Sequence, residues 1–462
     1  MLNTQIANDV IAYGISLGAD FAEIFVEKHN STNISVLSSK VHEIKSGIDF
    51  GIGIRLIYGT KVLYGYTNKT DKDELLRITR ALAAQDKRDP IATSTALNFM
   101  KTVDHHRASK GLSQDEISMD EKIQYLLKID AAARKESDKI SQVTCGVLQR
   151  LQDIEIFNSE GLHVTDTRNY TRLMANAVAT DGSEQSTGYD APGALSGWEL
   201  VDKINPVEMG ELVSKQALVK LTADDCPAGK MPVVIDNGFG GVIFHEACGH
   251  LLETTSVQKK ASVFWDKMEE DIAHSAVSAV DDGTMENLWG SINIDDEGME
   301  TKKTQLIKDG KLTSFLVDKV GSMRTGYDRT GSGRRQSYKY APASRMRNTY
   351  IEAGDHSLDD ILATIDNGIY CKKMGGGSVK PGTGEFNFSA QESYLIKNGK
   401  IDRPLKGATL IGTGPEVLKK ISMVGNNLAL AAGMCGSVSG SIPTSVGQAA
   451  LKVDEILVGG KA

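Results

Sequence analysis

Short runs in which β-branched residues alternate with polar ones recur along the first half of the chain, and they constrain the fold more than any other feature. They occupy residues 22–28, 33–39, 41–47 and 51–59. A period of two places apolar side chains on one face of a sheet and polar side chains on the other. The first half is therefore predicted to contain half-buried β-strands.

Segments with helical periodicity flank these strands. Residues 3–17 space their apolar side chains three and four positions apart, and residues 71–85 are typical of a helix capped by Asp71. The order of helix, strands and helix recurs between residues 117 and 221. We therefore predict an α+β fold, in which residues 1–225 form an N-terminal α/β domain with an internal duplication of helix and antiparallel sheet.

Asp, Pro and Gly gather at residues 222–232 and mark a domain boundary. With 462 residues the chain is too long for one compact core. Further along, Asp309-Gly310 and Asn398-Gly399 each lie between strand-like flanks, which is a strong short-range signal of a β-hairpin. Residues 230–462 are predicted to form a C-terminal antiparallel, barrel-like β domain that carries few helices.

The charge pattern excludes several classes of partner. The formal net charge is −8 and no long run of Lys or Arg occurs, so a nucleic-acid partner is not expected. No stretch of 18 apolar residues is present to span a membrane, and the first twenty residues lack the basic start of a signal peptide. The five cysteines are scattered without C-x-x-C spacing, which fits a reducing compartment. A cytoplasmic location is expected.

Three glycine-rich stretches, at residues 51–56, 331–336 and 375–384, lack the sequence context of nucleotide-binding loops. They are predicted to be turns or mobile loops. The wider segment 373–386 is also a candidate edge for a substrate that binds as an extended strand, because glycine admits a close backbone approach.

His245, Glu246 and His250 form the pattern H-E-x-x-x-H. A helix turns about 100° per residue, so the two histidines of a regular helix would point about 140° apart. A π-bulge or a break would bring them to one side, and Gly249 lowers the resistance to such a distortion. The predicted metal site therefore depends on an irregular helix; the alternative is an ordinary helix with two unrelated histidines.

Two neutral imidazoles are good zinc ligands, and a carboxylate beside them is suited to remove a proton from a zinc-bound water. Glu246 is the candidate general base. The residues alone leave the third ligand open among Glu253, Cys435 and the acidic run 295–297, which is more typical of a solvated turn.

The second half resembles the TldD/PmbA metallopeptidase family almost without interruption from residue 238 to 460, and residues 44–68 are similar more loosely. The matching segments include "FHEACGHLLE", "VDDGTMENLWGSINIDDEG", "KGATLIGTG" and "VDEILVGG". The resemblance implies a zinc-dependent peptidase that acts on unfolded or unstructured polypeptides, such as leader peptides and degradation intermediates. It also implies one Zn²⁺ per chain, with His245, His250 and Cys435 as ligands and Glu246 as the base.

The same resemblance implies the catalytic half of a heterodimer with a PmbA/TldE-like paralogue, or a homodimer. Arg347 stands where Thr is usual in the family, a departure that bears on peptide preference and not on the ligand set. Two other functions remain: a non-catalytic modulator or chaperone-like binder of protein partners, as in gyrase modulation, and an amidase acting on modified peptides. The intact His-Glu-His set favours the peptidase, because a binding module needs no general base.

Overall fold

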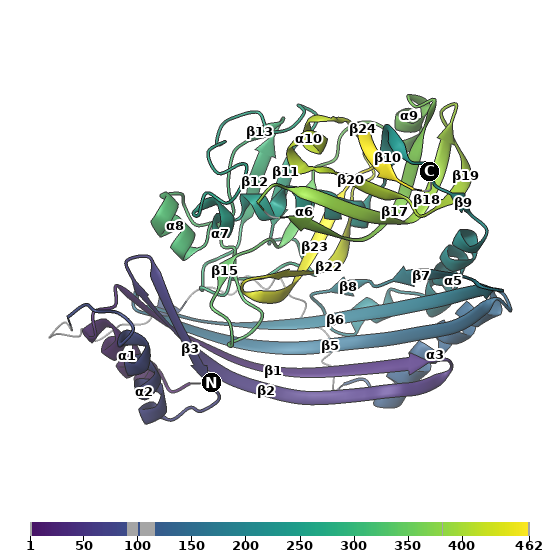
Figure 1. Cartoon of the computed structure of the whole chain (residues 1–462). Helices are drawn as coiled ribbons and strands as arrows, with labels where there is room; N and C mark the ends of the chain where they lie inside the picture. Colours follow the sequence, from purple (N-terminus) through teal and green to yellow (C-terminus); the bar gives the residue numbers. More distant parts are fainter. Residues whose placement is uncertain (1, 90–99, 102–115, 381, 461–462) are drawn as a thin grey trace.

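A long curved sheet lies beneath the second half of the molecule (Figure 1). The computed structural model describes residues 2–89, 100–101, 116–380 and 382–460. Long antiparallel strands form the centre of this first sheet in the order β2-β1-β5-β6: β1 (Phe21–Leu37), β2 (Lys40–Tyr58), β5 (Ile140–Asn158) and β6 (Leu162–Asp181). Shorter strands flank them: β3 (Lys61–Thr67), β4 (Met100–Lys101), β7 (Glu184–Asp190) and β8 (Gly193–Ala194).

One pair of helices lies toward each end of the long strands (Figure 1). The first pair is α1 (Thr4–Ser16) and α2 (Lys72–Ala83), and the second is α3 (Met119–Lys135) and α5 (Pro206–Leu221). The predicted cap of α2 is present, since the Asp71 side chain accepts a hydrogen bond from the backbone N–H of Glu74 at 3.0 Å. The order of helix, strands and helix thus occurs twice, and the antiparallel pairing of β1 with β5 joins the two repeats. The predicted α+β fold with an internal duplication is confirmed.

β1 and β2 each join two runs that the alternation predicted as separate strands, and the prediction of short strands is therefore wrong. Residues 22–28 and 33–37 both belong to β1. The apolar pattern weakens between them because the covering helices change. Val26 packs in the cluster that contains α1 and α2, whereas Ile34 packs in the cluster that contains α3 and α5. The polar stretch marks the gap between two helix pairs and not a turn.

The second half contains a closed barrel. β17 pairs with both β10 and β18, which closes the ring β10-β24-β20-β18-β17. Its strands are β10 (Gly229–Ile235), β17 (Asn367–Lys380), β18 (Glu385–Lys397), β20 (Thr409–Thr413) and β24 (Leu451–Gly459). The barrel-like architecture predicted for this half is confirmed, while the division of the chain at residues 1–225 and 230–462 stays a prediction.

A further sheet packs beside the barrel, with the strand order β13-β12-β11-β16-β23-β22 in the described part of the chain. Its strands are β11 (Ala279–Asp282), β12 (Lys303–Lys308), β13 (Lys311–Leu312), β16 (Asn348–Ile351), β22 (Ala429–Ser437) and β23 (Gly440–Gln448). Asp309-Gly310 joins β12 to β13, and Asn398-Gly399 joins β18 to β19 (Lys400–Lys406). All four turn residues have positive φ, as the hairpin prediction required.

A layer of buried charges lies between the first sheet and the second half. The Arg55 guanidinium, on β2, contacts Glu23 at 2.5 Å and Glu297 at 2.6 Å, and all three side chains are buried. Arg168 on β6 likewise contacts Asp296 at 2.7 Å. The prediction that residues 295–297 form a solvated turn is wrong, because all three side chains are buried and arginines of the distant first half pair with Asp296 and Glu297.

The glycine-rich residues 51–56 are also not a turn. They lie inside β2, where a Cβ on Gly51 would come within 2.1 Å of the Tyr338 ring. Glycine is needed there because an aromatic ring from the second half packs directly on the strand. Residues 333–334 of the second stretch form β14, and residues 375–380 of the third belong to β17; Pro381 lies outside the described residues.

Helices of the described chain are too short or too polar to cross a membrane. Each of the five cysteines is buried and free of a disulfide.

Candidate metal centre

The helix that carries the motif begins in a glycine turn pressed against a strand. The turn η1 (Gly238–Gly241) leads directly into α6 (Val242–Ala247). A Cβ on Gly241 would lie 2.5 Å from the backbone nitrogen of Gly447 on β23, so only glycine allows this approach. The helix then packs among barrel strands β17 and β18 and sheet strands β16 and β23. This packing buries His245 on a short, well-supported helix.

The helix breaks within the motif. α6 ends at Ala247, Cys248 has φ −131° and ψ −53°, and a 3₁₀ turn, η2 (Gly249–Leu252), follows. The break brings the rings of His245 and His250 to a centroid distance of 5.1 Å. A regular helix would have directed the two rings apart, so the break supplies the irregularity that the five-residue spacing required.

Gly249 permits this break through packing. A Cβ at that position would lie 2.2 Å from Sδ of Met346, a side chain that is fully buried. The backbone of the turn therefore approaches Met346 more closely than any other residue type allows.

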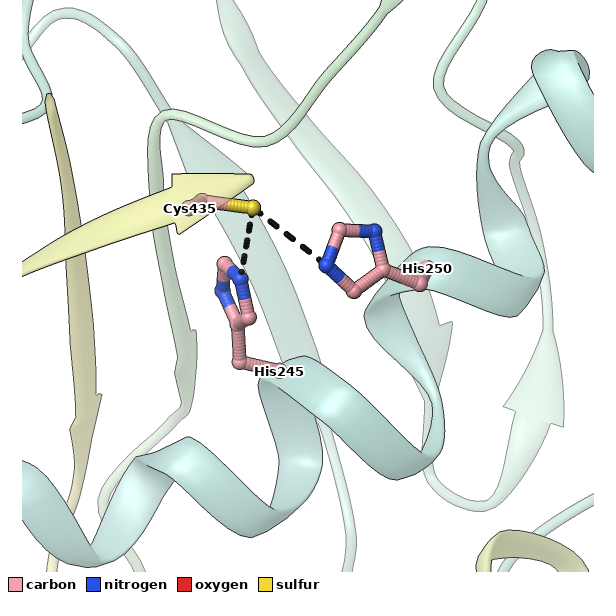
Figure 2. Close-up of side chains that lie close together, drawn as sticks. All are labelled: His245, His250 and Cys435. Carbon is pink, nitrogen blue, oxygen red and sulfur yellow. Dashed lines mark hydrogen bonds between the residues drawn. The ribbon is translucent and has the colours of Figure 1, made fainter. Parts of the chain in front are cut away.

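Cys435 on β22 completes a three-residue cluster (Figure 2). Its Sγ atom lies 3.2 Å from Nε2 of His245 and 3.3 Å from Nε2 of His250. The three ligand atoms lie within 4.8 Å of one another, and the side chains are buried or nearly so. In a tetrahedral zinc site, Zn–S and Zn–N bonds of about 2.3 and 2.0 Å place sulfur and nitrogen about 3.5 Å apart. The cluster therefore has the size of a metal site with one position open.

The cluster favours the thiolate form of Cys435 and the protonated form of His250, so a metal ion would replace the proton of His250 on binding. Burial alone would raise the pKa of the Cys435 thiol, but the two neighbouring imidazoles lower it well below its ordinary value. Burial alone would lower the pKa of His250, but the Glu253 carboxylate and the Cys435 sulfur raise it well above its ordinary value. The thiolate is the form of cysteine that binds metals. In addition, Nδ1 of His245 is buried without a hydrogen-bond partner among the described residues.

Glu246 and Glu253 occupy different places around His250. A carboxylate oxygen of Glu246 lies 3.8 Å from Nε2, the nitrogen that faces Cys435, and the Glu246 side chain is 28% exposed. Glu253 Oε2 instead lies 3.1 Å from Nδ1, on the far side of the ring, and is buried. Glu246 is thus partly open to solvent, whereas Glu253 supports the imidazole from behind.

The remaining candidate ligands lie elsewhere. Asp295 accepts hydrogen bonds from the backbone N–H groups of Glu297, Met299 and Gly333, so its oxygens are occupied in the layer of buried charges. Sequence reasoning did not single out Arg345, whose guanidinium reaches the carbonyl oxygen of Cys435. No sequence signal could have found it, because the contact joins residues 90 positions apart.

Comparison with known proteins identifies the class. The chain matches the PmbA/TldA metallopeptidase domain 1 over residues 22–85, the central domain over 113–221 and the C-terminal domain over 228–460. A protein of Haemophilus influenzae named "Metalloprotease TldD homolog" is 36% identical, with 99% of this chain and 97% of the relative covered. A "Zinc metalloprotease TldD homolog" of Saccharolobus solfataricus is 25% identical, with 96% and 97% covered.

Solved structures share the fold. A protein of Thermotoga maritima described as a modulator of a DNA gyrase has a TM-score of 0.81 at 20% identity, with 99% of this chain and all of that chain (100%) covered. TldE from Thermococcus kodakarensis has a TM-score of 0.77 at 18% identity, with 98% and 100% covered. The three family models and the 36% identical relative show that the protein is a metallopeptidase. It belongs to the PmbA/TldD family.

Proposed function

We propose that the chain is a zinc peptidase that hydrolyses unfolded polypeptides, with one zinc ion held by His245, His250 and Cys435. The observation that carries the proposal is the convergence of two imidazoles and one thiol, from elements far apart in the sequence, into a buried cluster of metal-site size. The relative named a zinc metalloprotease supports the choice of metal.

Glu246 is the general base of this mechanism. Zinc in the cluster would supply a Lewis acid that polarises the attacking water and the peptide carbonyl. The Glu246 carboxylate, 3.8 Å from Nε2 of His250, removes the proton from that water and returns it to the leaving amine. The partial exposure of Glu246 leaves room for substrate on this side of the cluster.

The outer edge of β17 is the proposed place for the substrate backbone. Between Lys372 and Lys380, β17 pairs with β18 on one side, and no described strand pairs with its other side. The strand packs beside α6, and a Cβ on Gly376 would meet nothing within 4 Å. Main-chain pairing along this edge gives affinity for an unfolded peptide of almost any sequence. A peptide complex without main-chain hydrogen bonds to this part of β17 would contradict the assignment.

The edge strand β22, which carries Cys435, is less suited to pairing with the substrate backbone, although it lies closer to the metal ligands. The outward carbonyl of Gly433 accepts a hydrogen bond from Nε1 of Trp289 at 2.8 Å, and that of Cys435 accepts one from Arg345 at 2.5 Å. These side chains already cover the edge of β22, so a peptide would have to displace them.

A PmbA/TldE-like paralogue, or a second copy of this chain, is the proposed partner, and the cytoplasm is the proposed location. The similarity of the fold to TldE supports a pairing of two related subunits. The measurement that tests the pairing is the mass of the purified chain in solution, alone and after mixing with a co-expressed paralogue.

Modulation of a DNA gyrase is the second candidate function. The observation that favours it is the similar fold of the Thermotoga maritima protein described as a gyrase modulator. One experiment separates the two functions. The purified chain is analysed for metal and incubated with an unfolded protein, with and without a chelator. Bound zinc near one equivalent and chelator-sensitive cleavage are expected; full cleavage after removal of all metal, or no cleavage by the zinc-loaded chain and its partner, would exclude the proposed chemistry.

A further inference from the structure

Behind the cluster, two buried side chains connect the ligands to one another. Glu253 lies three residues beyond His250, where the chain leaves the turn η2 with extended backbone (φ −74°, ψ 130°). Its Oε2 atom contacts Nδ1 of His250 at 3.1 Å, opposite the nitrogen that faces Cys435. A metal-binding histidine commonly gives its second ring N–H to a carboxylate, which fixes the ring and its tautomer.

Arg345 performs the corresponding task for the third ligand. Its Nη2 donates to the carbonyl oxygen of Cys435 at 2.5 Å, and its Nη1 donates to Oγ of Ser439 at 2.9 Å and to the carbonyl oxygen of Gly440 at 2.8 Å. These acceptors lie near the end of β22, in the turn that follows it and at the first residue of β23. The guanidinium therefore fixes the tip of the hairpin that carries Cys435.

The two side chains also face each other. Nε of Arg345 lies 4.0 Å from Oε1 of Glu253, and both side chains are buried. Neither of these two atoms has a hydrogen-bond partner among the described residues. Two buried, oppositely charged groups whose facing atoms lack other partners form an ion pair, because leaving either alone is costly.

We propose that Glu253 and Arg345 are positioning residues that clamp His250 and Cys435 at the separation a metal requires. Glu253 fixes the imidazole on one element, Arg345 fixes the sulfur-bearing hairpin on the other, and their ion pair joins the two elements. The clamp rests on the proposed function, since His250 and Cys435 are metal ligands only within it.

The chain offers a matched control two residues further on. Arg347 is equally buried and forms an ion pair with Asp281 at 2.5 Å, in the same part of the second half. Its guanidinium contacts Asp281, threonines and backbone carbonyls and, within the described part of the chain, forms no hydrogen bond with Cys435 or Glu253. Arg347→Lys thus disturbs a buried arginine without disturbing the clamp.

The test measures the zinc affinity of the folded full-length chain by competition with a chromophoric chelator. Glu253→Gln and Arg345→Lys are each expected to weaken zinc binding by about 10- to 100-fold, the usual effect of losing an outer-shell partner. Because the two act as one unit, the double variant should lose little more than either single variant. Arg347→Lys should leave the affinity within about threefold of the parent while lowering thermal stability.

The visible spectrum of the Co²⁺-loaded chain provides a readout that a general loss of stability would not move. A changed ligand geometry in Glu253→Gln and Arg345→Lys should alter the cobalt bands, whereas Arg347→Lys should retain the parent spectrum. A parent chain that binds no metal would overturn the metal site and the clamp together. Parent-like affinity and spectra in both clamp variants, with Cys435→Ala unable to bind, would overturn the clamp alone. Equal losses in Arg347→Lys would also overturn it.

Discussion

Sγ of Cys435 lies 3.2 Å from Nε2 of His245, although the two residues are 190 positions apart in the chain. Such a close approach of one buried sulfur to two imidazole nitrogens needs a structural or chemical reason. Here the approach links α6, which packs in the barrel region, to the edge strand of the neighbouring sheet. Several measurements test whether the reason is a metal ion.

Cys435→Ala is expected to abolish stoichiometric zinc binding, because it removes the sulfur that lies against both imidazoles. Metal content after dialysis measures the effect. Cys145→Ala and Cys226→Ala serve as controls, since both residues are buried cysteines outside the cluster. A Cys435→Ala chain that keeps a full equivalent of zinc, together with a Glu253→Ala chain that loses it, would assign the third ligand to Glu253.

Glu246→Gln is expected to retain the metal and lower peptide hydrolysis by at least about 100-fold, because the amide keeps the shape of the side chain but cannot accept a proton. The checks are kcat on an unfolded protein substrate and metal content on the same preparation. Hydrolysis within a few-fold of the parent rate would rule out Glu246 as the base.

Removal of the metal is expected to lower the melting temperature. A ligand that binds only the folded state at one hundred times its Kd stabilises that state by about 2.7 kcal/mol. Differential scanning calorimetry with and without chelator measures the shift. Cys435→Ala is the control: its melting temperature should not respond to the chelator, and an equal response would show that the stabilising ion binds elsewhere.

Gly249→Ala is expected to destabilise the chain by about 1–3 kcal/mol, the usual effect of overpacking a core. The added Cβ would lie 2.2 Å from Sδ of Met346, and the displacement would move the neighbouring His250. Zinc affinity should therefore fall as well. Gly376→Ala is a suitable comparison, because a Cβ there meets nothing within 4 Å. Denaturant unfolding and zinc competition of both variants decide the matter, and parent-like values for Gly249→Ala would contradict the packing argument.

Because the pKa of the buried Glu297 is lowered in the folded state, the chain is expected to lose stability in acid. Burial alone would raise its pKa, but Arg55 and Arg329 lower it to about 2, from an ordinary value of 4.5. A carboxyl group whose pKa is lower in the folded state stabilises that state above the unfolded pKa, and the stabilisation disappears as the pH falls from 4.5 to 2. The shift corresponds to on the order of 3 kcal/mol.

Urea unfolding between pH 6 and pH 2 checks this expectation. Glu297→Gln should be less stable than the parent at pH 6, and its stability should depend less on pH below 4.5. Parallel curves for the two chains would show that other groups control the acid transition.

Sequence patterns predicted the local elements well. The Asp71 cap, the positive φ values of Asn398 and Gly399, and the periodicity of residues 3–17 are all local properties of the chain, and each corresponds to an observed element. The five-residue spacing of His245 and His250 made the predicted metal site depend on an irregular helix, and the helix does break within the motif.

Such local patterns could not predict contacts between residues that are far apart in the sequence. The acids at residues 295–297 resemble a surface turn by composition, but their burial depends on arginines far away in the sequence, such as Arg55, which lies 242 positions before Glu297. The prediction that Cys435 is the third ligand came from the family resemblance, because the residues alone left several candidates open. The contact of Arg345 with Glu253 joins two segments that are far apart in the sequence, which no short segment encodes.

The pairing of β1 with β5 has a consequence for the order of folding. The hairpins β1–β2 and β5–β6 close over short turns, whereas β1 and β5 meet through contacts such as Gln152 to Glu27, which lie 125 positions apart. Closing a long loop costs more chain entropy than closing a turn. Each hairpin is therefore expected to gain amide protection early in refolding, and the central β1–β5 ladder, on which the long sheet depends, to gain it last.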